Sequence, residues 1–282
     1  MCVIIIDRSM TPAGWRAAGK AAAVTGAGSG IGRALCSALA RQGAKSLVCM
    51  DLNVANAQAT ADQISKQHSD VAVRACHVDA SDEGNLRGAL RASGPLDLFC
   101  ANAGIATTGE LSGDMNSDDW QKTWNVNVMQ IAIAADELVP SMVERGGGAL
   151  LVTASAAGLL SQLGSAPYTA TKHAAVGLAE WLAITYGDQG IHVSCLCPQG
   201  VRTPMVTDGL LQESTLARAV MVDGLLEPDE VAEDALLALA DGRFLCMPGN
   251  AGKHVERKAA DRDRWIVGMQ RFQAKLLAKQ DG

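Results

Sequence analysis

Hydrophobic and polar residues follow two alternating patterns along the chain. Short, nearly continuous apolar runs are separated by longer segments in which apolar residues recur at helical spacing. The runs predict buried strands over residues 20–26, 46–51, 71–79, 96–104, 148–155, 191–198 and 243–247. The segments between them predict helices over residues 32–43, 53–67, 82–92, 117–144, 167–187 and 228–240.

This order of elements predicts the fold class. Strands that are apolar throughout and alternate with helices are typical of a parallel sheet covered on both faces. We therefore expect an α/β protein with a single doubly wound, Rossmann-like domain, in which helices flank a sheet of about seven parallel strands. The domain is predicted over residues 18–248, after a loose leader at 1–17 and before a helical extension at 249–282.

The extension carries an apolar stripe. Its aromatic and aliphatic residues recur at the spacing of one helix face, at Trp265, Met269, Phe272 and Leu276. Such a stripe predicts an amphipathic helix that packs on the body of the protein or on a partner subunit.

Composition narrows the class of function. The chain has 282 residues and a net charge of −6, which disfavours a main role in binding nucleic acid. Its eight cysteines form no C-x-x-C pair and mostly lie in apolar runs, which favours reduced, buried thiols over disulfides or a metal site. Cys195 and Cys197 are expected on the same side of one strand, packed in the core. No apolar stretch reaches about 18 residues, so we expect a cytoplasmic protein that does not enter a membrane.

A glycine-rich turn, VTGAGSGIGRAL, links the first predicted strand to the first predicted helix. Glycines at 26, 28, 30 and 32 permit a tight turn and a close approach of the backbone to a ligand. The following helix N-terminus can bind a pyrophosphate through free N–H groups. The spacing is T-G-x-x-x-G-x-G and not G-x-G-x-x-G, and a purely structural turn is the alternative. Its position between strand and helix favours a dinucleotide site.

Asp51 ends the second predicted strand and supports that interpretation. A carboxylate there can accept hydrogen bonds from the ribose hydroxyls and repel a 2′-phosphate. Ser29, in the glycine turn, is neutral where a phosphate site would place a basic residue. Both residues favour NAD over NADP, although Asp51 alone could be an ordinary loop carboxylate.

The segment YTATK places Tyr168 and Lys172 one helical turn apart, on the same helix face. A solvated surface pair is the bland interpretation. The chemical one is a proton-transfer device, because a nearby ammonium and a positive nicotinamide ring favour the phenolate and lower its pKa from about 10. A serine hydroxyl such as that of Ser155 can hold the same substrate oxygen.

Taken together, the motifs resemble those of the short-chain dehydrogenase/reductase family over residues 18–247. The resemblance rests on eight motifs in order: TGAGSGIG (25–32), Asp51, HVDAS with Asp79, ANAG (101–104), NVNV with Asn127, TASAAG with Ser155, YTATK (168–172) and CPQGVRT (197–203).

The resemblance implies a role for each matching residue. Tyr168 would be the general acid/base, Lys172 its activator, and Ser155 the group that holds the substrate oxygen. Asn127 would anchor a water that relays protons through Lys172. The implied cofactor contacts are Gly26, Ser29, Gly30, Ile31, Gly32, Asp51, Asp79 (to adenine), Asn102 (in the adenosine pocket), Gly104, Lys172, Val201 and Thr203 (to the carboxamide).

Two positions depart from the family pattern. Ala101 stands where the family often has a first asparagine, and we expect little effect. Gln199 stands where the family usually has glycine after the proline of the sixth strand. A glutamine at this edge of the pocket could hydrogen-bond the substrate or narrow the site.

The combined interpretation is an NAD-dependent oxidoreductase that interconverts a secondary alcohol and a ketone. Residues 204–226 fall where the family places its substrate lid and are rich in Leu, Met and Val, which predicts a sterol-like, fatty or cyclic substrate. Packing of the lid explains any single one of these residues equally well. Two alternatives stay open: a 3-oxoacyl-thioester reductase of the same fold, and a non-catalytic NAD-binding regulatory protein. The resemblance also implies a homodimer or homotetramer.

Overall fold

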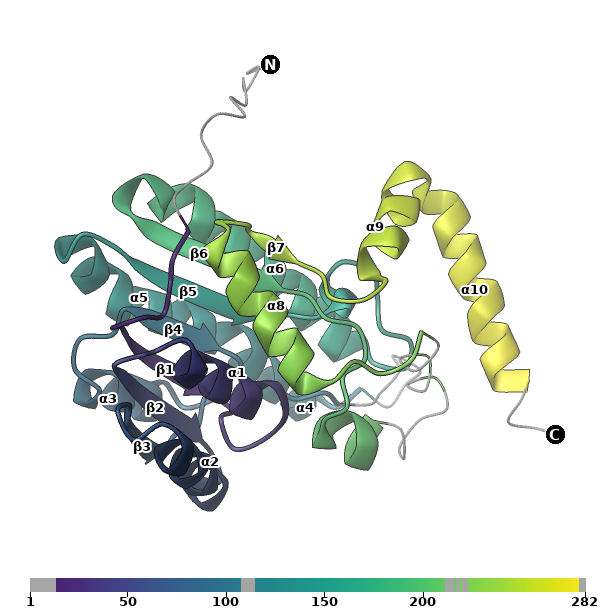
Figure 1. The fold of residues 1–282 in the computed structure, drawn as a ribbon. Coiled ribbons are helices and arrows are strands. Elements are labelled where there is room, and N and C mark those ends of the chain that lie inside the picture. The colour runs from purple at the N-terminus through teal and green to yellow at the C-terminus, as the bar shows by residue number, and fades with distance from the viewer. Residues whose placement is uncertain (1–13, 108–114, 211–215, 217–218, 220–222, 279–282) are drawn as a thin grey trace.

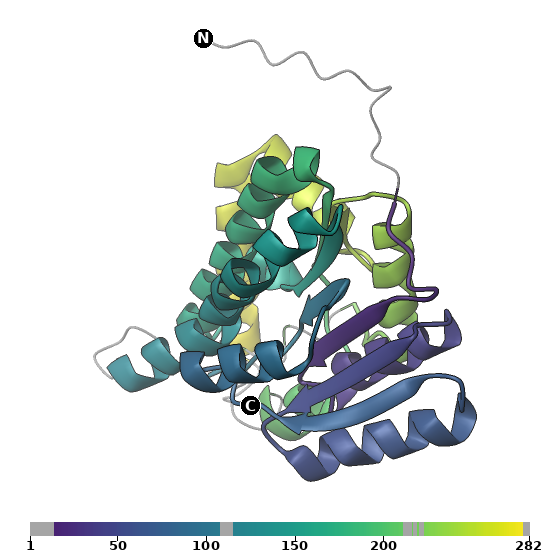
Figure 2. The same cartoon turned by 90° about the vertical axis from the view of Figure 1, so that its left-hand side faces the viewer.

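A computed structural model describes residues 14–107, 115–210, 216, 219 and 223–278. Seven parallel strands form one sheet in the order β3-β2-β1-β4-β5-β6-β7, and helices cover both of its faces (Figures 1 and 2). The predicted fold class is confirmed. The strands are β1 (Ala21–Thr25), β2 (Ser46–Asp51), β3 (Ala72–His77), β4 (Leu98–Ala101), β5 (Gly148–Thr153), β6 (Ile191–Leu196) and β7 (Leu245–Cys246).

The helices fill the two outer layers and the C-terminal extension. The α-helices are α1 (Gly30–Arg41), α2 (Val54–Gln67), α3 (Glu83–Ala92), α4 (Ser117–Trp124), α5 (Gln130–Glu144), α6 (Ala166–Tyr186), α8 (Pro228–Ala240), α9 (Ala251–Ala260) and α10 (Arg262–Ala278). Short 3-10 helices η2 (Ala156–Gly158) and η3 (Gly187–Gln189) and π-helical turns η1 (Asn125–Met129) and η4 (Met205–Leu210) join them.

The sheet separates two hydrophobic cores. Alternate strand residues face opposite sides, so Val24 belongs to one core and its neighbour Ala23 to the other. The first core packs α1, α2 and α8 on the sheet, and the second packs α3, α5 and α6. Burial on both faces explains why the strands are apolar at nearly every position. Because all seven strands are parallel, their carboxyl ends lie at the same edge of the sheet, where ligands bind in such sheets.

The structure differs from the sequence-based prediction at the end of β4 and inside the helix predicted over 117–144. Strand β4 ends at Ala101 because the next N–H groups, of Asn102 and Ala103, donate to the Thr25 hydroxyl and not to a strand. Helix α4 begins at Ser117 as predicted, and its N-cap is Asn116, whose side chain accepts from Asp118 N. The helix predicted over 117–144 is continuous but contains the π-helical turn η1.

The fold begins before the predicted domain boundary. Trp15 is buried and its N–H donates to Leu239 O of α8. Residues 1–13 of the predicted leader lie outside the described residues. At the other end, the extension forms α9 and α10, which project from the sheet edge near the end of β7 (Figure 1).

One helical stretch among the described residues, Ser117–Glu144, is long and apolar enough to cross a membrane by composition alone. Within its most apolar window, 61% of the residues are buried in the fold. Such burial is typical of a core helix in a folded domain, and this stretch packs on the sheet and on neighbouring helices.

Candidate active site

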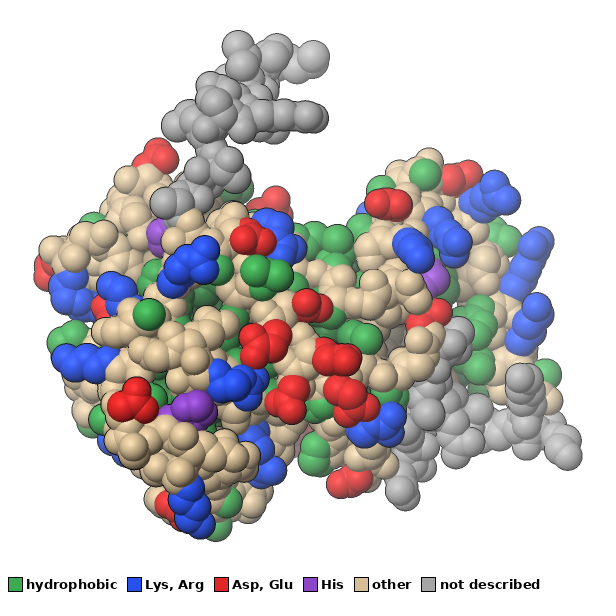
Figure 3. Space-filling view, in the orientation of Figure 1, with side chains coloured by type: hydrophobic (Ala, Val, Ile, Leu, Met, Phe, Trp, Pro, Cys, Tyr) green, Lys and Arg blue, Asp and Glu red, His purple; other side chains and the backbone are tan. Residues whose placement is uncertain are grey.

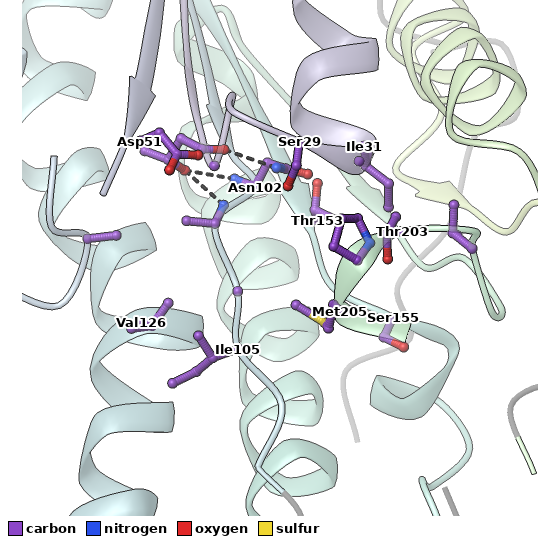
Figure 4. A pocket seen from close by; sticks show the side chains of 18 of the residues that line it. Ser29, Ile31, Asp51, Asn102, Ile105, Val126, Thr153, Ser155, Thr203 and Met205 are labelled. Atoms are coloured by element: carbon purple, nitrogen blue, oxygen red, sulfur yellow. Dashed lines mark hydrogen bonds between the residues drawn. The ribbon is translucent and has the colours of Figure 1, made fainter. Parts of the chain in front are cut away.

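The carboxyl ends of the strands surround a cavity of about 450 Å³. Figure 4 shows its wall, with Asp51 and Asn102 at one end and Ser155 and Met205 at the other. Most of the predicted site residues line it: Gly26, Ser29, Gly30, Ile31, Asp51, Asp79, Asn102, Gly104, Ser155, Tyr168, Lys172, Val201 and Thr203. Gly32 and Asn127 lie behind the wall and support it.

The glycine turn brings bare backbone to the cavity. Gly26 and Gly30 have φ values of 67° and 49°, a region that favours glycine. At Gly32 a Cβ atom would lie 2.1 Å from the carbonyl oxygen of Gly26, so only glycine fits. The N-cap residue Ser29 makes no side-chain cap, which leaves the first N–H groups of α1 available to a ligand. The turn therefore fits a pyrophosphate at a helix N-terminus.

Asp51 is held over this turn by two backbone donors. Its Oδ2 atom accepts from Gly28 N at 2.8 Å, and its Oδ1 atom accepts from Asn53 N at 2.8 Å. A Cβ atom at Gly28 would lie 2.8 Å from the same Oδ2 atom, so glycine is required for the approach. The carboxylate is thereby fixed at the cavity wall, where it could accept hydrogen bonds from the ribose hydroxyls of a bound dinucleotide.

A buried polar cluster holds the floor between β1 and β4. The Thr25 hydroxyl accepts from Asn102 N and Ala103 N, both at 3.0 Å, and donates to Gln130 Oε1 at 2.9 Å. The Asn102 amide donates to Thr25 O at 3.0 Å. Gln130 Nε2 donates to Ala103 O at 2.5 Å. Asn102 is thus fixed against the glycine turn, and Gln130 is a supporting residue that the sequence did not reveal.

Asp79 lies on the cavity wall beyond β3. Ser81 donates to its Oδ1 atom through both N–H, at 2.8 Å, and hydroxyl, at 2.6 Å. The hydroxyl hydrogen bond is the main reason that the pKa of Asp79 is lowered. The carboxylate is therefore charged and oriented where an adenine amine could donate to it.

The predicted catalytic residues come together at the other end of the cavity. Tyr168 and Lys172 occupy successive turns of α6, and the Lys172 Nζ atom lies 5.6 Å from the centre of the Tyr168 ring. Lys172 is 3% exposed and donates to Thr153 O at 2.9 Å. Ser155 caps η2, and its hydroxyl accepts from Ala157 N at 3.1 Å. Lys172 is thus buried and Tyr168 half-buried beside a cavity, and the two are not a solvated surface pair.

Burial shifts both titrating groups. It raises the pKa of Tyr168, and interaction with the Ser155 hydroxyl opposes that rise. It also lowers the pKa of Lys172 to about 8. The sequence predicts a lowered phenol pKa, and in the chain itself the direction is the opposite. The positive charge of an oxidised nicotinamide ring would act in the predicted direction.

Asn127 sits in the π-helical turn η1, behind Gly104. Its amide donates to Ile105 O and Thr171 Oγ1, at 3.0 and 3.1 Å, and its Oδ1 accepts from Ile105 N at 2.9 Å. A Cβ atom at Gly104 would lie 3.4 Å from both Asn127 Oδ1 and Lys172 Nζ. Asn127 therefore holds the Ile105 backbone beside Lys172, and the role as a water anchor stays a prediction.

Two residues after β6 complete the wall. Val201 is buried and forms an isolated bridge with Leu226. Thr203 packs so closely on the glycine turn that a Cβ atom at Gly30 would lie 2.8 Å from its Cγ2 atom. The segment that follows β6 thus closes over the N-terminus of α1.

Both polar atoms of the Gln199 side-chain amide form hydrogen bonds within the protein. Its Nε2 atom donates to Asp223 Oδ2 at 2.7 Å, and its Oε1 atom accepts from Asn250 N at 2.7 Å. The residue that departs from the family pattern therefore ties residue 223 to the start of α9.

One buried hydroxyl in the cavity wall has no partner. Among the described residues, Thr153 Oγ1 is the buried side-chain oxygen or nitrogen that makes no hydrogen bond. Buried polar atoms are nearly always paired. Because Thr153 lines the cavity, a ligand bound there fits as the missing partner.

Met205 and Val206 belong to the predicted lid, and both line the cavity. Several other lining residues were not identified from the sequence: Leu52, Ile105, Lys122 and Val126. Leu52 directly follows Asp51, and its position was a usable signal. Val126 stands next to Asn127 in the NVNV motif, and Ile105 directly follows ANAG, so both positions were also usable signals. Lys122 lies on α4 outside the quoted motifs, and only tertiary structure brings it to the cavity.

Most of the described cysteines pack in the two hydrophobic cores. Cys195 in β6 and Cys197 just after its end point to the same side, as predicted, with Sγ atoms 3.8 Å apart, and both are buried. Over residues 14–107, 115–210 and 223–278, no three His, Cys, Asp or Glu side chains are placed to hold a metal ion.

Known proteins share this arrangement. The family model described as short chain dehydrogenase matches residues 20–213. The chain is 30% identical over 224 residues to the cyclohexanol dehydrogenase of Acinetobacter sp. strain SE19, covering 79% of this chain and 88% of that protein. It is 30% identical over 233 residues to 3beta-hydroxysteroid dehydrogenase 2 of Eggerthella lenta, covering 79% and 89%.

A solved structure agrees over most of the fold. The crystal structure of a short chain dehydrogenase/reductase from Burkholderia phymatum in complex with NAD superposes with a TM-score of 0.78 at 28% identity. The superposition covers 88% of this chain and 96% of the Burkholderia phymatum chain. The chain therefore belongs to the short chain dehydrogenase family and is an oxidoreductase with a site for a nicotinamide dinucleotide.

Proposed function

We propose that the protein is an NAD-dependent dehydrogenase/reductase that interconverts a secondary alcohol and a ketone, with Tyr168 as general acid/base. The observation that carries this proposal is the shared cavity. Ser155, Tyr168 and Lys172 line one end of the same space whose other end is formed by the glycine turn and Asp51.

The chain's own residues supply the proton chemistry. A bound nicotinamide cofactor supplies or accepts the hydride. In reduction, the neutral Tyr168 phenol donates its proton to the substrate oxygen, and the Ser155 hydroxyl holds that oxygen in place. In oxidation, the proton moves in reverse, from the carbinol to the phenolate. The Lys172 ammonium stabilises the phenolate form from the next turn of α6.

The preference for NAD rests on Asp51. Two backbone N–H groups fix its carboxylate beside the glycine turn, where it can accept from ribose hydroxyls and would repel a 2′-phosphate. Leu52, the next residue, lines the same end of the cavity and adds no positive charge for a phosphate. The NAD complex of the Burkholderia phymatum relative supports this choice.

An apolar substrate is supported by the wall near Ser155. Ile105, Val126, Met205 and Val206 line the cavity, and Figure 4 shows Met205 beside Ser155. Two relatives are a cyclohexanol dehydrogenase and a 3beta-hydroxysteroid dehydrogenase, and both names refer to largely apolar alcohols. Much of the predicted lid, residues 204–226, lies outside the described residues, so these four residues carry the argument.

We further propose a homodimer or homotetramer in the cytoplasm. The helices α4 to α6 leave large apolar side chains exposed: Trp124, Met129, Trp181 and Ile184. Exposed residues of this size are typical of interaction surfaces.

The cytoplasmic location is supported by the cysteines. The seven cysteines among the described residues are free thiols, as favoured in a reducing compartment.

Absorbance at 340 nm tests this function. The protein is supplied with NAD⁺ or NADP⁺ and with cyclohexanol, 2-octanol or 3-hydroxybutyrate. We expect kcat/KM at least about tenfold higher with NAD⁺ than with NADP⁺, and faster turnover of the two apolar alcohols than of the charged hydroxy acid. Turnover of 3-hydroxybutyrate alone would contradict the substrate class, and a preference for NADP⁺ would contradict the role of Asp51.

A further inference from the structure

A second cavity, of about 370 Å³, adjoins the first. Ser155, Pro198 and Gln199 line both. One side of the second cavity is the loop that follows Ser155, with Leu160 and Leu163. The other side is the C-terminal extension. A substrate oxygen held at Ser155 therefore has open space on the side away from the cofactor.

The extension is fastened to the rest of the protein at three points, one of them on this loop. Lys258 of α9 donates to the carbonyl oxygens of Leu159 and Leu160, at 2.7 and 2.8 Å. His254 forms a 2.8 Å contact with Asp223, and Asn250 N donates to Gln199 as described above. Burial is the main reason that the pKa of Lys258 is lowered. Helix α9 is thus held in a defined position relative to the catalytic serine.

Helix α10 turns its apolar stripe to the cavity. Trp265, Met269 and Phe272 line it, and all three are half-buried. Ile266 and Val267, on the other side of the helix, are 47% and 43% exposed. Figure 3 shows hydrophobic side chains on the side of α10 toward the body and Lys and Arg side chains along its outer side. Three of the four residues of the stripe predicted from sequence therefore face the cavity, and Leu276 does not line it.

The charged groups at this cavity do not favour a charged substrate. Asp223 is paired with His254, and this contact is the main reason that the pKa of Asp223 is lowered. Arg257 is exposed at the rim. The remaining lining is mostly aliphatic and aromatic, and a space of this size suits a ring system or long chain.

We propose that α9 and α10 complete the substrate compartment, and that its ligand is a secondary alcohol or ketone with a bulky apolar body. This inference rests on the proposed function. The reacting carbon lies at Ser155 and Tyr168, and the apolar body lies between Leu160 and the stripe of α10. The family model ends at residue 213, so this wall belongs to the part of the chain beyond the family match.

The test compares a small and a bulky alcohol in matched variants. Trp265→Ala and Phe272→Ala each remove part of the wall, and Ile266→Ala removes an apolar side chain from the other side of the same helix. With NAD⁺, we expect each wall variant to lower kcat/KM for cyclododecanol about tenfold and for cyclohexanol less than about twofold. Ile266→Ala should leave both values unchanged.

A binding measurement separates this inference from the proposed function. Calorimetric titration with cyclododecanone needs no turnover, and we expect binding to the wild type and to Ile266→Ala, with about tenfold weaker binding to Trp265→Ala. If no alcohol is oxidised but this binding pattern holds, the compartment is supported and the proposed function fails. Equal losses for both alcohols, or cyclododecanone binding that is the same in all variants, would overturn the compartment.

Discussion

The Lys172 ammonium lies 5.6 Å from the centre of the Tyr168 ring, with Lys172 buried and Tyr168 half-buried at the cavity wall. Burial opposes charge on each of them, so the phenol is held neutral and the ammonium is destabilised. The protein alone is therefore ready to donate a proton. A positive charge arriving in the cavity is what makes the phenolate accessible.

Replacing Lys172 with methionine should stabilise the protein without cofactor. The folded pKa of Lys172 is about 8, below its ordinary value of 10.5. Between these values the unfolded chain binds more protons, so stability rises with pH across this window, and the full penalty is present below about pH 8. We expect Lys172→Met to be more stable at pH 7 by at most about 3 kcal/mol, to lose this pH dependence, and to lose activity.

Urea unfolding from pH 7 to 10.5 measures this effect, with Lys66→Met on the exposed side of α2 as the control. The control should keep the wild-type slope. A Lys172→Met protein that is less stable than the wild type at pH 7, with the slope intact, would refute the burial penalty.

The cofactor preference should depend on the Asp51 carboxylate. Asp51→Ala removes the acceptor for ribose hydroxyls and the repulsion of a 2′-phosphate, so the ratio of kcat/KM for NAD⁺ over NADP⁺ should fall about 100-fold. Asp62→Ala, on the exposed side of α2, should leave the ratio unchanged. Steady-state kinetics with both cofactors measure this ratio, and an unaltered ratio in Asp51→Ala would remove the basis for the NAD assignment.

Thr153→Val should have opposite effects on the free protein and on cofactor binding. The hydroxyl is buried without a partner, so its removal should raise the free energy of unfolding by about 1–2 kcal/mol. If the cofactor supplies the partner, NADH binding measured by fluorescence should weaken about fivefold.

The control for Thr153→Val is Thr60→Val, since Thr60 is buried but its hydroxyl donates to Ala27 O at 2.9 Å. This variant should be less stable than the wild type. Destabilisation of Thr153→Val to the same degree would show that its hydroxyl is satisfied in the free protein.

The glycine turn should tolerate no side chain at Gly32, where its backbone passes close to that of Gly26. Gly32→Ala would place a Cβ atom 2.1 Å from Gly26 O, and backbone cannot yield there without moving the turn. We expect a loss of about 2 kcal/mol or more and weakened NADH binding. Gly177→Ala, at an exposed position of α6 with no atom within 4 Å, should instead stabilise by about 0.5–1 kcal/mol. Thermal unfolding of the two variants compares these signs directly.

Local sequence signals predicted most of the site, and long-range contacts account for what they missed. The strand–turn–helix order and the spacing of Tyr168 and Lys172 are properties of neighbouring residues, so the pattern predicted them. The bonds from Thr25 to Gln130 and from Gln199 to Asp223 join residues 105 and 24 positions apart. Such pairs leave no periodic trace, and the direction of the Tyr168 pKa shift likewise depends on tertiary burial.

The C-terminal stripe shows the same limit. Its helical spacing predicted a face that packs on something, and Trp265, Met269 and Phe272 do turn toward the body. Spacing alone could not distinguish a packed contact from the wall of a cavity, because both need the same apolar residues.

The central claim is that Tyr168 transfers the proton, and the chain offers a matched control because its second tyrosine is Tyr186. Tyr186 ends α6 and packs edge-on against Trp181, with ring centroids 5.9 Å apart. NADH formation from NAD⁺ and cyclohexanol should fall at least about 1,000-fold in Tyr168→Phe and stay within about twofold in Tyr186→Phe, with NADH binding retained in both. A Tyr168→Phe protein that binds NADH and oxidises cyclohexanol at the wild-type rate would contradict the account.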